Sequence, residues 1–267
     1  MKRSARVCML FAAIMLAALP GRVLAKVYIE PTNACNLDCS TCMRNVWEER
    51  PGWMSWQTYE HVLQGIRSIQ PTPTVFFGGL GEPLAHPKIR EMVAAARNAG
   101  AEVEMITNGT LLDENVAQWM VAYKLSRVWV SIDGATPGSY MDVRLGDALP
   151  QVIHHITTLK QLSSHSSLFL PKLAIACVAT KRNMSDLPEV IRLGKRLGAD
   201  QFSITNVLPY NAALRREVLY NTSISMDSVT PSRWSPLVSI PRMNHDVIFL
   251  RLLPEAMKSY IALQLSR

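Results

Sequence analysis

The chain has 267 residues, of which 48% are hydrophobic and 18% are charged, so it can bury a sizeable core and its composition does not indicate disorder. Its formal charge of +7 includes Lys2, Arg3, Arg6 and Arg22, with no acidic residue before Lys26. Without those four charges the rest of the chain carries about +3, which is too little to indicate a nucleic-acid-binding protein.

The first 25 residues have the pattern of a secretory signal. Lys2, Arg3 and Arg6 precede an apolar run at 7–20, and residues 23–25 (Val-Leu-Ala) resemble a cleavage site. The apolar run is shorter than the about 20 residues that span a bilayer. Two interpretations stay open, namely an exported or membrane-anchored chain and an adventitious extension.

Apolar runs rich in β-formers alternate with amphipathic stretches through the centre of the chain. The expected strands are 27–30, 74–77, 102–107, 127–132, 172–180 and 201–207, and the expected helices are 56–69, 87–99, 113–122, 149–162 and 185–197. Such alternation predicts an α/β protein with a parallel sheet and right-handed crossovers. Six units in about 180 residues are fewer than the eight of a complete barrel, which typically needs about 250.

Local signals support the helix ends. Asp113 and Ser185 are expected to cap the starts of their helices, and Gly100 and Gly198 follow the ends of two others. From 209 onward the alternation stops, and only a helix at 245–265, broken at Pro254, is expected there.

Three cysteines, Cys35, Cys39 and Cys42, follow the first expected strand. Thiolates at this spacing can hold three corners of a [4Fe–4S] cube and leave one iron open. A zinc site completed by His61 or Cys177 is an alternative, although zinc commonly uses two cysteine pairs. A disulfide, or an electron-transfer cluster with a fourth cysteine, also stays open.

The C-x₃-C-x₂-C loop after an extended segment resembles the signature of radical S-adenosylmethionine (radical SAM) enzymes. The resemblance implies a partial (β/α)₆ TIM-like barrel with two cofactors, a [4Fe–4S] cluster and S-adenosylmethionine (SAM). In that family the open iron binds the methionine moiety of SAM, and an electron from the cluster cleaves a C–S bond to give a 5′-deoxyadenosyl radical. The cofactors supply the chemistry and the protein supplies position and protection.

A glycine turn, Gly78-Gly79-Leu80-Gly81-Glu82-Pro83, follows the second expected strand. Glycines let a backbone approach a ligand closely. In the resembled family the matching turn presents main-chain groups to the amino group of SAM, which implies this role for Gly78, Gly79, Gly81 and Glu82. Without the cysteine loop the same residues would indicate an ordinary turn between a strand and a helix.

Three polar residues at or after later strand ends are further candidates. The resemblance implies that Asn108 and Ser131 contact the ribose or methionine of SAM, and that Arg144 pairs with its carboxylate through a bidentate guanidinium. The alternative interpretations are a turn former for Asn108, a helix cap for Ser131 and a solvated charge for Arg144. No residue is assigned as a catalytic acid or base.

A narrower resemblance covers about 27–242, through motifs that include 133–137 (Asp-Gly-Ala-Thr-Pro) and 205–210 (Thr-Asn-Val-Leu-Pro-Tyr). It is to the radical SAM maturases of tungsten-containing aldehyde ferredoxin oxidoreductases. Thr41 departs from the aromatic residue that many radical SAM proteins have before the third cysteine. The sequence also lacks a cysteine-rich C-terminal extension, since no cysteine follows Cys177.

These patterns predict three segments: a signal-like or adventitious extension at 1–25, a radical SAM core barrel at 26–208, and an extended segment with a helix, truncated relative to the maturases, at 209–267. The expected function is reductive SAM cleavage in maturation of a tungsten cofactor or its oxidoreductase. The expected partners are a low-potential electron donor of the ferredoxin or flavodoxin type and a tungsten-containing oxidoreductase, with no nucleic acid. A cytoplasmic location is expected, because an oxygen-sensitive cluster does not suit an oxidising exterior. A non-catalytic iron–sulfur module and an inactive fragment are the alternatives.

Overall fold

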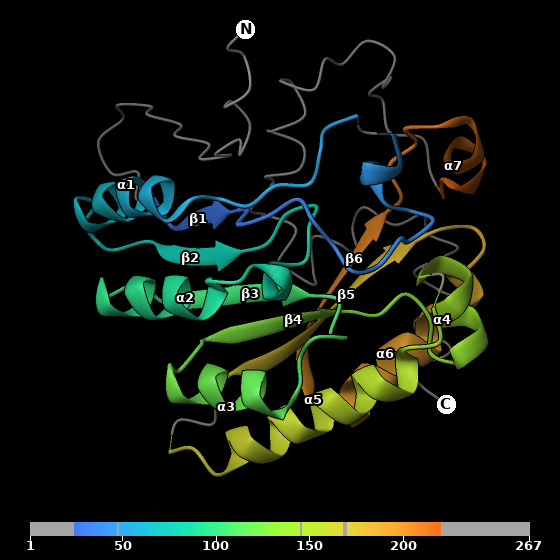
Figure 1. The fold of residues 1–267 in the computed structure, drawn as a ribbon. Coiled ribbons are helices and arrows are strands. Elements are labelled where there is room, and N and C mark those ends of the chain that lie inside the picture. Colours follow the sequence, from blue (N-terminus) through green and yellow to red (C-terminus); the bar gives the residue numbers. More distant parts are fainter. Residues whose placement is uncertain (1–23, 47, 145, 168–169, 220–267) are drawn as a thin grey trace, which may run out of the picture.

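The computed structural model describes residues 24–46, 48–144, 146–167 and 170–219. Its centre is one sheet of six parallel strands, in which each strand pairs with the next one in the chain (Figure 1). The strands are β1 (Lys26–Ile29), β2 (Thr74–Phe77), β3 (Val103–Thr107), β4 (Arg127–Ser131), β5 (Lys172–Ala179) and β6 (Ala199–Asn206). All six predicted strands are confirmed within two residues of their expected ends. Within the described residues β1 and β6 do not pair, so the sheet is open, as predicted for a partial barrel.

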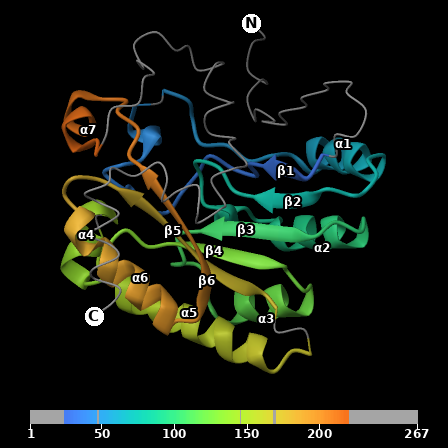
Figure 2. The ribbon, with the colours of Figure 1, turned by 180° about the vertical axis from the view of Figure 1, so that it is seen from behind.

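Most of the helices connect successive strands and lie along the outside of the curved sheet, whereas the last helix follows the last strand (Figures 1 and 2). They are α1 (Trp56–Arg67), α2 (Ile89–Asn98), α3 (Glu114–Ala122), α4 (Pro137–Arg144), α5 (Leu149–Ser164), α6 (Leu187–Arg196) and α7 (Ala212–Glu217). Three short 3₁₀ helices are η1 (Met43–Val46), η2 (Pro83–Ala85) and η3 (Met184–Asp186). The five predicted helices are confirmed, whereas α4 and α7 were not predicted.

Most of the predicted helix ends are confirmed by their capping geometry. The Asp113 side chain accepts a hydrogen bond from the Val116 amide at the start of α3. Gly100 and Gly198 follow α2 and α6 with φ of +85° and +83°, a conformation that favours glycine because it has no Cβ.

The prediction that Ser185 caps α6 is wrong. The turn η3 runs directly into α6, so the residue before the helix is Asp186, and its side chain does not cap the helix. Its carboxylate instead accepts hydrogen bonds from the Ala135 amide at 2.7 Å and the Ser139 hydroxyl at 2.6 Å. The Asp186 carboxylate therefore bonds to residues about 50 positions earlier in the chain, and no side chain caps the start of α6.

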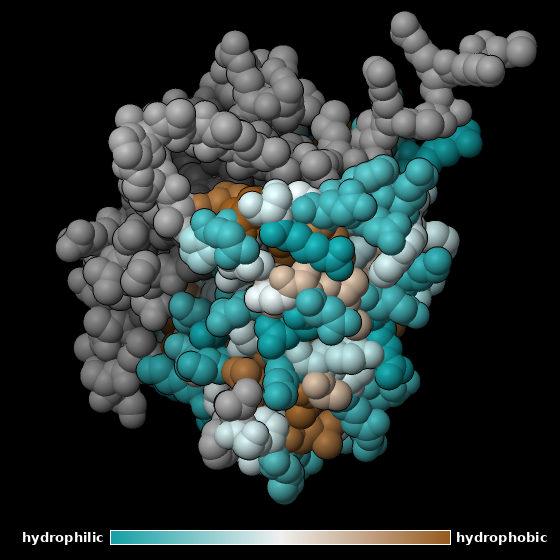
Figure 3. All heavy atoms as spheres, turned by 90° about the vertical axis from the view of Figure 1, so that its left-hand side faces the viewer, coloured by the Kyte–Doolittle hydropathy of each residue, from teal (hydrophilic) through white to brown (hydrophobic). Residues whose placement is uncertain are grey.

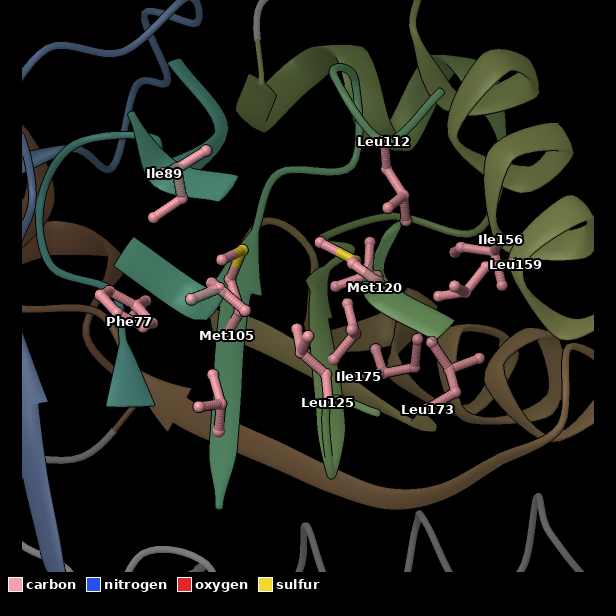
Figure 4. Close-up of a cluster of buried hydrophobic side chains, with 14 of the residues drawn as sticks. Phe77, Ile89, Met105, Leu112, Met120, Leu125, Ile156, Leu159, Leu173 and Ile175 are labelled. Atoms are coloured by element: carbon pink, nitrogen blue, oxygen red, sulfur yellow. The ribbon is translucent and has the colours of Figure 1, made fainter. Parts of the chain in front are cut away.

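The hydrophobic core lies between the sheet and its helices. In Figure 4, side chains from strands and helices meet, among them Met105 of β3, Met120 of α3, Ile156 of α5 and Ile175 of β5. All four are at most 1% exposed. The face on the left of Figure 1 carries mostly hydrophilic side chains with small apolar areas between them (Figure 3).

The parallel arrangement brings the carboxyl ends of the strands to one edge of the sheet, where barrel enzymes keep their sites. The cysteine loop follows β1 and the glycine turn follows β2, so the two predicted motifs begin at neighbouring positions of this edge. Among residues 24–219, leaving out the four undescribed positions between them, no helix combines the length and apolar character needed to span a membrane. The expected signal-like stretch, except for residues 24 and 25, and the expected helix at 245–265 lie outside the described residues.

Candidate active site

A cavity of about 280 Å³ lies at the carboxyl ends of the strands. It brings together nine of the ten residues that the sequence singled out, which are Cys35, Cys39, Cys42, Gly79, Gly81, Glu82, Asn108, Ser131 and Arg144. Gly78 is the exception, because it lies at the start of the turn, where a Cβ would be 2.5 Å from the Ile106 side chain. A glycine at position 78 therefore allows close packing of the turn, and its expected role toward SAM stays a prediction.

The cysteine loop is held in place by segments that follow it far along the chain. The Ser40 amide donates to the Val143 carbonyl of α4 at 2.9 Å, and the Tyr210 hydroxyl donates to the Cys42 carbonyl at 2.5 Å. Burial, with smaller contributions from the Cys42 and Cys39 thiols, raises the pKa of Tyr210 to about 12, so this hydroxyl stays a donor at neutral pH. Residues after β4 and after β6 thus fix the ends of the Cys39–Cys42 segment.

A buried ion pair lies beside Cys39. Arg144 Nη2 is 2.6 Å from Asp133 Oδ2, and the two side chains are only 11% and 1% exposed. Asp133 Oδ1 also accepts a hydrogen bond from the Val178 amide at 2.7 Å. Burial acts to lower the pKa of Arg144, but Asp133 and Cys39 together outweigh it and raise the value, so the guanidinium stays charged. The expected role of Arg144 toward a SAM carboxylate stays a prediction, because the structure shows this side chain paired with Asp133.

The glycine turn packs closely against the segment between β1 and Cys35. The Leu80 amide donates to Glu30 Oε1 at 2.5 Å, and the Glu82 amide donates to the Ala34 carbonyl at 2.8 Å. Gly79 has φ of +141°, and a Cβ there would be 2.4 Å from Glu30 Oε1. The turn needs glycine here for both the backbone conformation and the close approach.

Glu82 joins the turn to the end of β3. Its carboxylate accepts hydrogen bonds from the Asn108 amide at 2.7 Å and the Leu84 amide at 3.1 Å, and the residue is only 2% exposed. Burial raises the pKa of the Glu82 carboxyl, although these amide N–H groups act in the opposite direction. The side chain therefore fixes the shape of the cavity wall.

Asn108 and Ser131 differ in the hydrogen bonds that their side chains already form within the protein. Asn108 Nδ2 donates to Asn36 Oδ1 at 2.9 Å, and Asn108 Oδ1 accepts from the Thr110 amide at 2.9 Å. The Ser131 hydroxyl, at the end of β4, has no hydrogen-bond partner among the described residues. Ser131 therefore keeps a donor and an acceptor for a ligand, whereas Asn108 is mostly committed to the cysteine loop.

We expect Gly81→Ala to lower the free energy of unfolding by about 2–3 kcal/mol, because the added Cβ would lie 2.0 Å from the Thr32 carbonyl oxygen, which is backbone and cannot move aside easily. Urea unfolding followed by circular dichroism measures the change. Gly65→Ala in α1 is the matched control, since its Cβ would meet nothing within 4 Å and alanine favours a helix. Equal stability of Gly81→Ala and wild type would contradict the close contact.

The donor set of the site fits a cluster. Within the described residues, no three His, Cys, Asp or Glu side chains form a group suited to one metal ion. In a [4Fe–4S] cube each thiolate binds a different iron, so three cysteines that line one cavity suit it. His61 lies on α1 and Cys177 is buried on β5, and neither lines the cavity.

The sequence of this chain matches the radical SAM superfamily over residues 29–194. The chain belongs to this superfamily. Radical SAM enzymes use a [4Fe–4S] cluster and SAM, which agrees with the predicted cofactors. The matched region runs from the last residue of β1 into α6 and includes the cysteine loop and the glycine turn.

Among curated relatives, this radical SAM chain is 28% identical over 228 residues to the tungsten-containing aldehyde ferredoxin oxidoreductase cofactor-modifying protein of Pyrococcus furiosus. That alignment covers 85% of the chain and 62% of the relative. The chain is also 28% identical over 182 residues to the AdoMet-dependent heme synthase of Methanosarcina barkeri, covering 67% of the chain and 50% of that protein. The chain thus spans about half to two thirds of the length of these relatives.

Solved structures show the same fold. Streptococcus suis SuiB bound to S-adenosylmethionine has a TM-score of 0.61 at 18% identity, covering 74% of this radical SAM chain and 44% of SuiB. Native anSMEcpe with bound AdoMet has a TM-score of 0.60 at 19% identity, covering 79% of the chain and 57% of anSMEcpe. These similarities confirm the predicted partial-barrel fold class.

Sequence reasoning missed three charged residues of the radical SAM site: Glu30, Arg44 and Asp133. Each lies within three residues of a recognised feature, since Glu30 follows β1, Arg44 follows Cys42 by two positions and Asp133 follows Ser131 by two. Their proximity to strand ends and to the cysteines could have identified them as candidate site residues. Their partners Leu80, Leu37 and Arg144 are known only from the fold.

Proposed function

We propose that this chain reductively cleaves SAM at a [4Fe–4S] cluster held by Cys35, Cys39 and Cys42, and that the reaction serves maturation of a tungsten cofactor or of a tungsten-containing aldehyde ferredoxin oxidoreductase. The observation that carries the proposal is one cavity lined by all three thiols and by the glycine turn. Its volume of about 280 Å³ is close to the lower end of small-molecule pockets, which hold roughly 300–1,000 Å³.

The cluster, when bound, supplies the electron that cleaves a C–S bond of SAM. The residues of the chain bind SAM and orient it in the cavity. Gly79 and Gly81 bring backbone close to the cavity and receive the amino group of SAM, and the free Ser131 hydroxyl receives a polar group of its ribose or methionine. Glu82 and Asn108 keep the wall of the cavity rigid, because each side chain is hydrogen-bonded to neighbouring segments.

Similarity to the Pyrococcus furiosus protein over 85% of the chain supports the tungsten part of the proposal. The proposal includes a low-potential electron donor of the ferredoxin or flavodoxin type and a tungsten-containing oxidoreductase, or its cofactor, as partners. We also propose residues 26–208 as the catalytic core and the cytoplasm as its location, where an oxygen-sensitive cluster is protected.

Anaerobic reconstitution with iron and sulfide, followed by dithionite and SAM, tests the cleavage. We expect 5′-deoxyadenosine, and we expect SAM to change the EPR spectrum of the reduced cluster. A fully loaded protein that makes no 5′-deoxyadenosine, with an EPR spectrum unaffected by SAM, would instead indicate an electron-transfer module.

The tungsten step needs its own experiment. Tungsten-containing aldehyde ferredoxin oxidoreductase purified from cells that lack this chain is incubated with the loaded chain, SAM and dithionite. We expect a gain in oxidoreductase activity or a change in the mass of its cofactor, with the Cys39→Ala chain as the control. If SAM is cleaved but the oxidoreductase and its cofactor stay unchanged, the substrate assignment is wrong and the cleavage reaction stands.

A further inference from the structure

Each of the three thiols faces one side-chain N–H donor, and the three donors come from different parts of the fold. The pairs are Asn108 Nδ2 with Cys35 Sγ at 3.7 Å, Arg144 Nη1 with Cys39 Sγ at 3.6 Å, and Arg44 Nε with Cys42 Sγ at 3.4 Å. Asn108 follows β3, Arg144 ends α4 and Arg44 lies in η1. Two of the three donors are positively charged, and among the described residues that line the cavity they are the only Lys or Arg side chains.

Both arginines are fixed by a second contact. Arg44 Nη2 donates to the Leu37 carbonyl at 2.5 Å, and Arg144 Nη2 pairs with Asp133. A guanidinium presents several N–H groups in a rigid fork, so a contact at one nitrogen orients the others. The two donors therefore keep their positions relative to the thiols.

The charges around the Cys39 and Cys42 thiols differ. Arg144 is compensated by the nearby carboxylate of Asp133, with side chains 11% and 1% exposed, whereas Arg44 has no acidic ion-pair partner within the described residues. Asp38 acts on Arg44 electrostatically but forms no ion pair with it, and Arg44 is partly exposed to solvent, so its positive charge near Cys42 is weakened but less compensated than that of Arg144. Arg44 is the more informative of the two for an experiment.

We infer that Arg44 and Arg144 are positioning residues for Cys42 and Cys39, and that the positive charge of Arg44 raises the reduction potential of the cluster. The inference rests on the proposed function, because it requires the cluster. Reduction adds one negative charge, so a nearby cation and an N–H donor to a ligand sulfur stabilise the reduced form more than the oxidised form. Such contacts outside the metal ligands also orient the ligands themselves.

The test is a redox titration of the anaerobically reconstituted chain, with the EPR signal of the reduced cluster as readout. For Arg44→Gln we expect an about tenfold lower ratio of reduced to oxidised cluster at a fixed solution potential, which for one electron corresponds to about 59 mV. Arg44→Lys keeps the charge and should keep most of the wild-type ratio. Arg182→Gln removes an equal charge at an exposed position outside the cavity, and its ratio should match wild type.

A second variant predicts a shift of opposite sign. Asp133→Asn removes the carboxylate that compensates Arg144, so the ratio of reduced to oxidised cluster should rise. A variant that only destabilised the fold would not raise the ratio of reduced to oxidised cluster. If Arg44→Gln takes up no cluster, this variant tests the electrostatic argument on which the inference rests, and a ratio equal to or below wild type would overturn that argument and the inference with it.

Iron and sulfide content separates the possible failures. If wild type binds no [4Fe–4S] cluster, the proposed function fails and the inference fails with it. If wild type is loaded and Arg44→Gln titrates like Arg182→Gln, only the inference is overturned. A lower cluster content in Arg44→Gln than in Arg182→Gln supports the positioning role.

Discussion

Cys39→Ala is expected to abolish both cluster binding and formation of 5′-deoxyadenosine. Cys39 is the buried member of the three, and its carbonyl also accepts hydrogen bonds from the Cys42 amide and from Asn45 Nδ2, so it lies at the centre of the loop. Without its thiol only two of the three proposed protein ligands remain, too few to hold a cube. Iron and sulfide analysis after anaerobic reconstitution, and chromatography of the SAM products, measure the two losses.

Cys177→Ala is the matched control, because it also removes a buried thiol. Cys177 packs in the hydrophobic core on β5 and does not line the cavity. We expect a loss of stability of about 1 kcal/mol but normal cluster content. A normal cluster in Cys39→Ala would contradict the assignment of the ligands, and loss of the cluster in Cys177→Ala would favour a cluster with four cysteine ligands.

Arg144→Ala is expected to lower the free energy of unfolding by about 3–5 kcal/mol, the cost of breaking a buried ion pair from one side. The change leaves the Asp133 carboxylate, only 1% exposed, without its cation. The anchoring of the cysteine loop would suffer as well, because the Val143 carbonyl that holds Ser40 is the adjacent residue of α4. Urea unfolding of the purified chain gives the value.

Arg182→Ala is the control for this experiment. Arg182 pairs with Asp142 at 3.4 Å and with Glu217 at 3.6 Å, but its side chain is 53% exposed and neither partner is buried, so we expect a change of about 1 kcal/mol. The double variant Asp133→Ala/Arg144→Ala should lose less stability than the two single variants summed, because it leaves no unpaired buried charge. Additive losses would mean that the two side chains do not interact.

The fold class followed from sequence because its signals are local and periodic. Apolar strands, intervening amphipathic helices and capping residues such as Asp113 each act within a few positions of the chain, and the six strands and five helices appear where they were expected. The helix α4 was missed because its eight residues contain Pro137 and Gly138 and its apolar face is short. Burial of Tyr140 and Val143 against other elements stabilises it, and this contact is tertiary.

The site, like the fold, has parts that the sequence predicts and parts that only the tertiary structure shows. The candidate ligands and the glycine turn could be recognised because their spacing lies within single loops, and nine of those ten residues line one cavity. The contacts of Arg144 could not be recognised, since Cys39 lies 105 positions earlier in the chain. A solvated charge was one interpretation of this arginine, yet its side chain is nearly buried against Asp133.

Spacing in the primary structure alone determined which atoms this protein offers to a cofactor: three thiols within eight residues and a turn that only glycine can form. Folding decided what surrounds them, namely two guanidinium groups, a buried carboxylate and a tyrosine hydroxyl drawn from distant segments. The reason is physical. Covalent connectivity sets distances over a few residues, whereas charges and hydrogen-bond donors far apart in the chain meet only when parallel strands place their ends at a common edge.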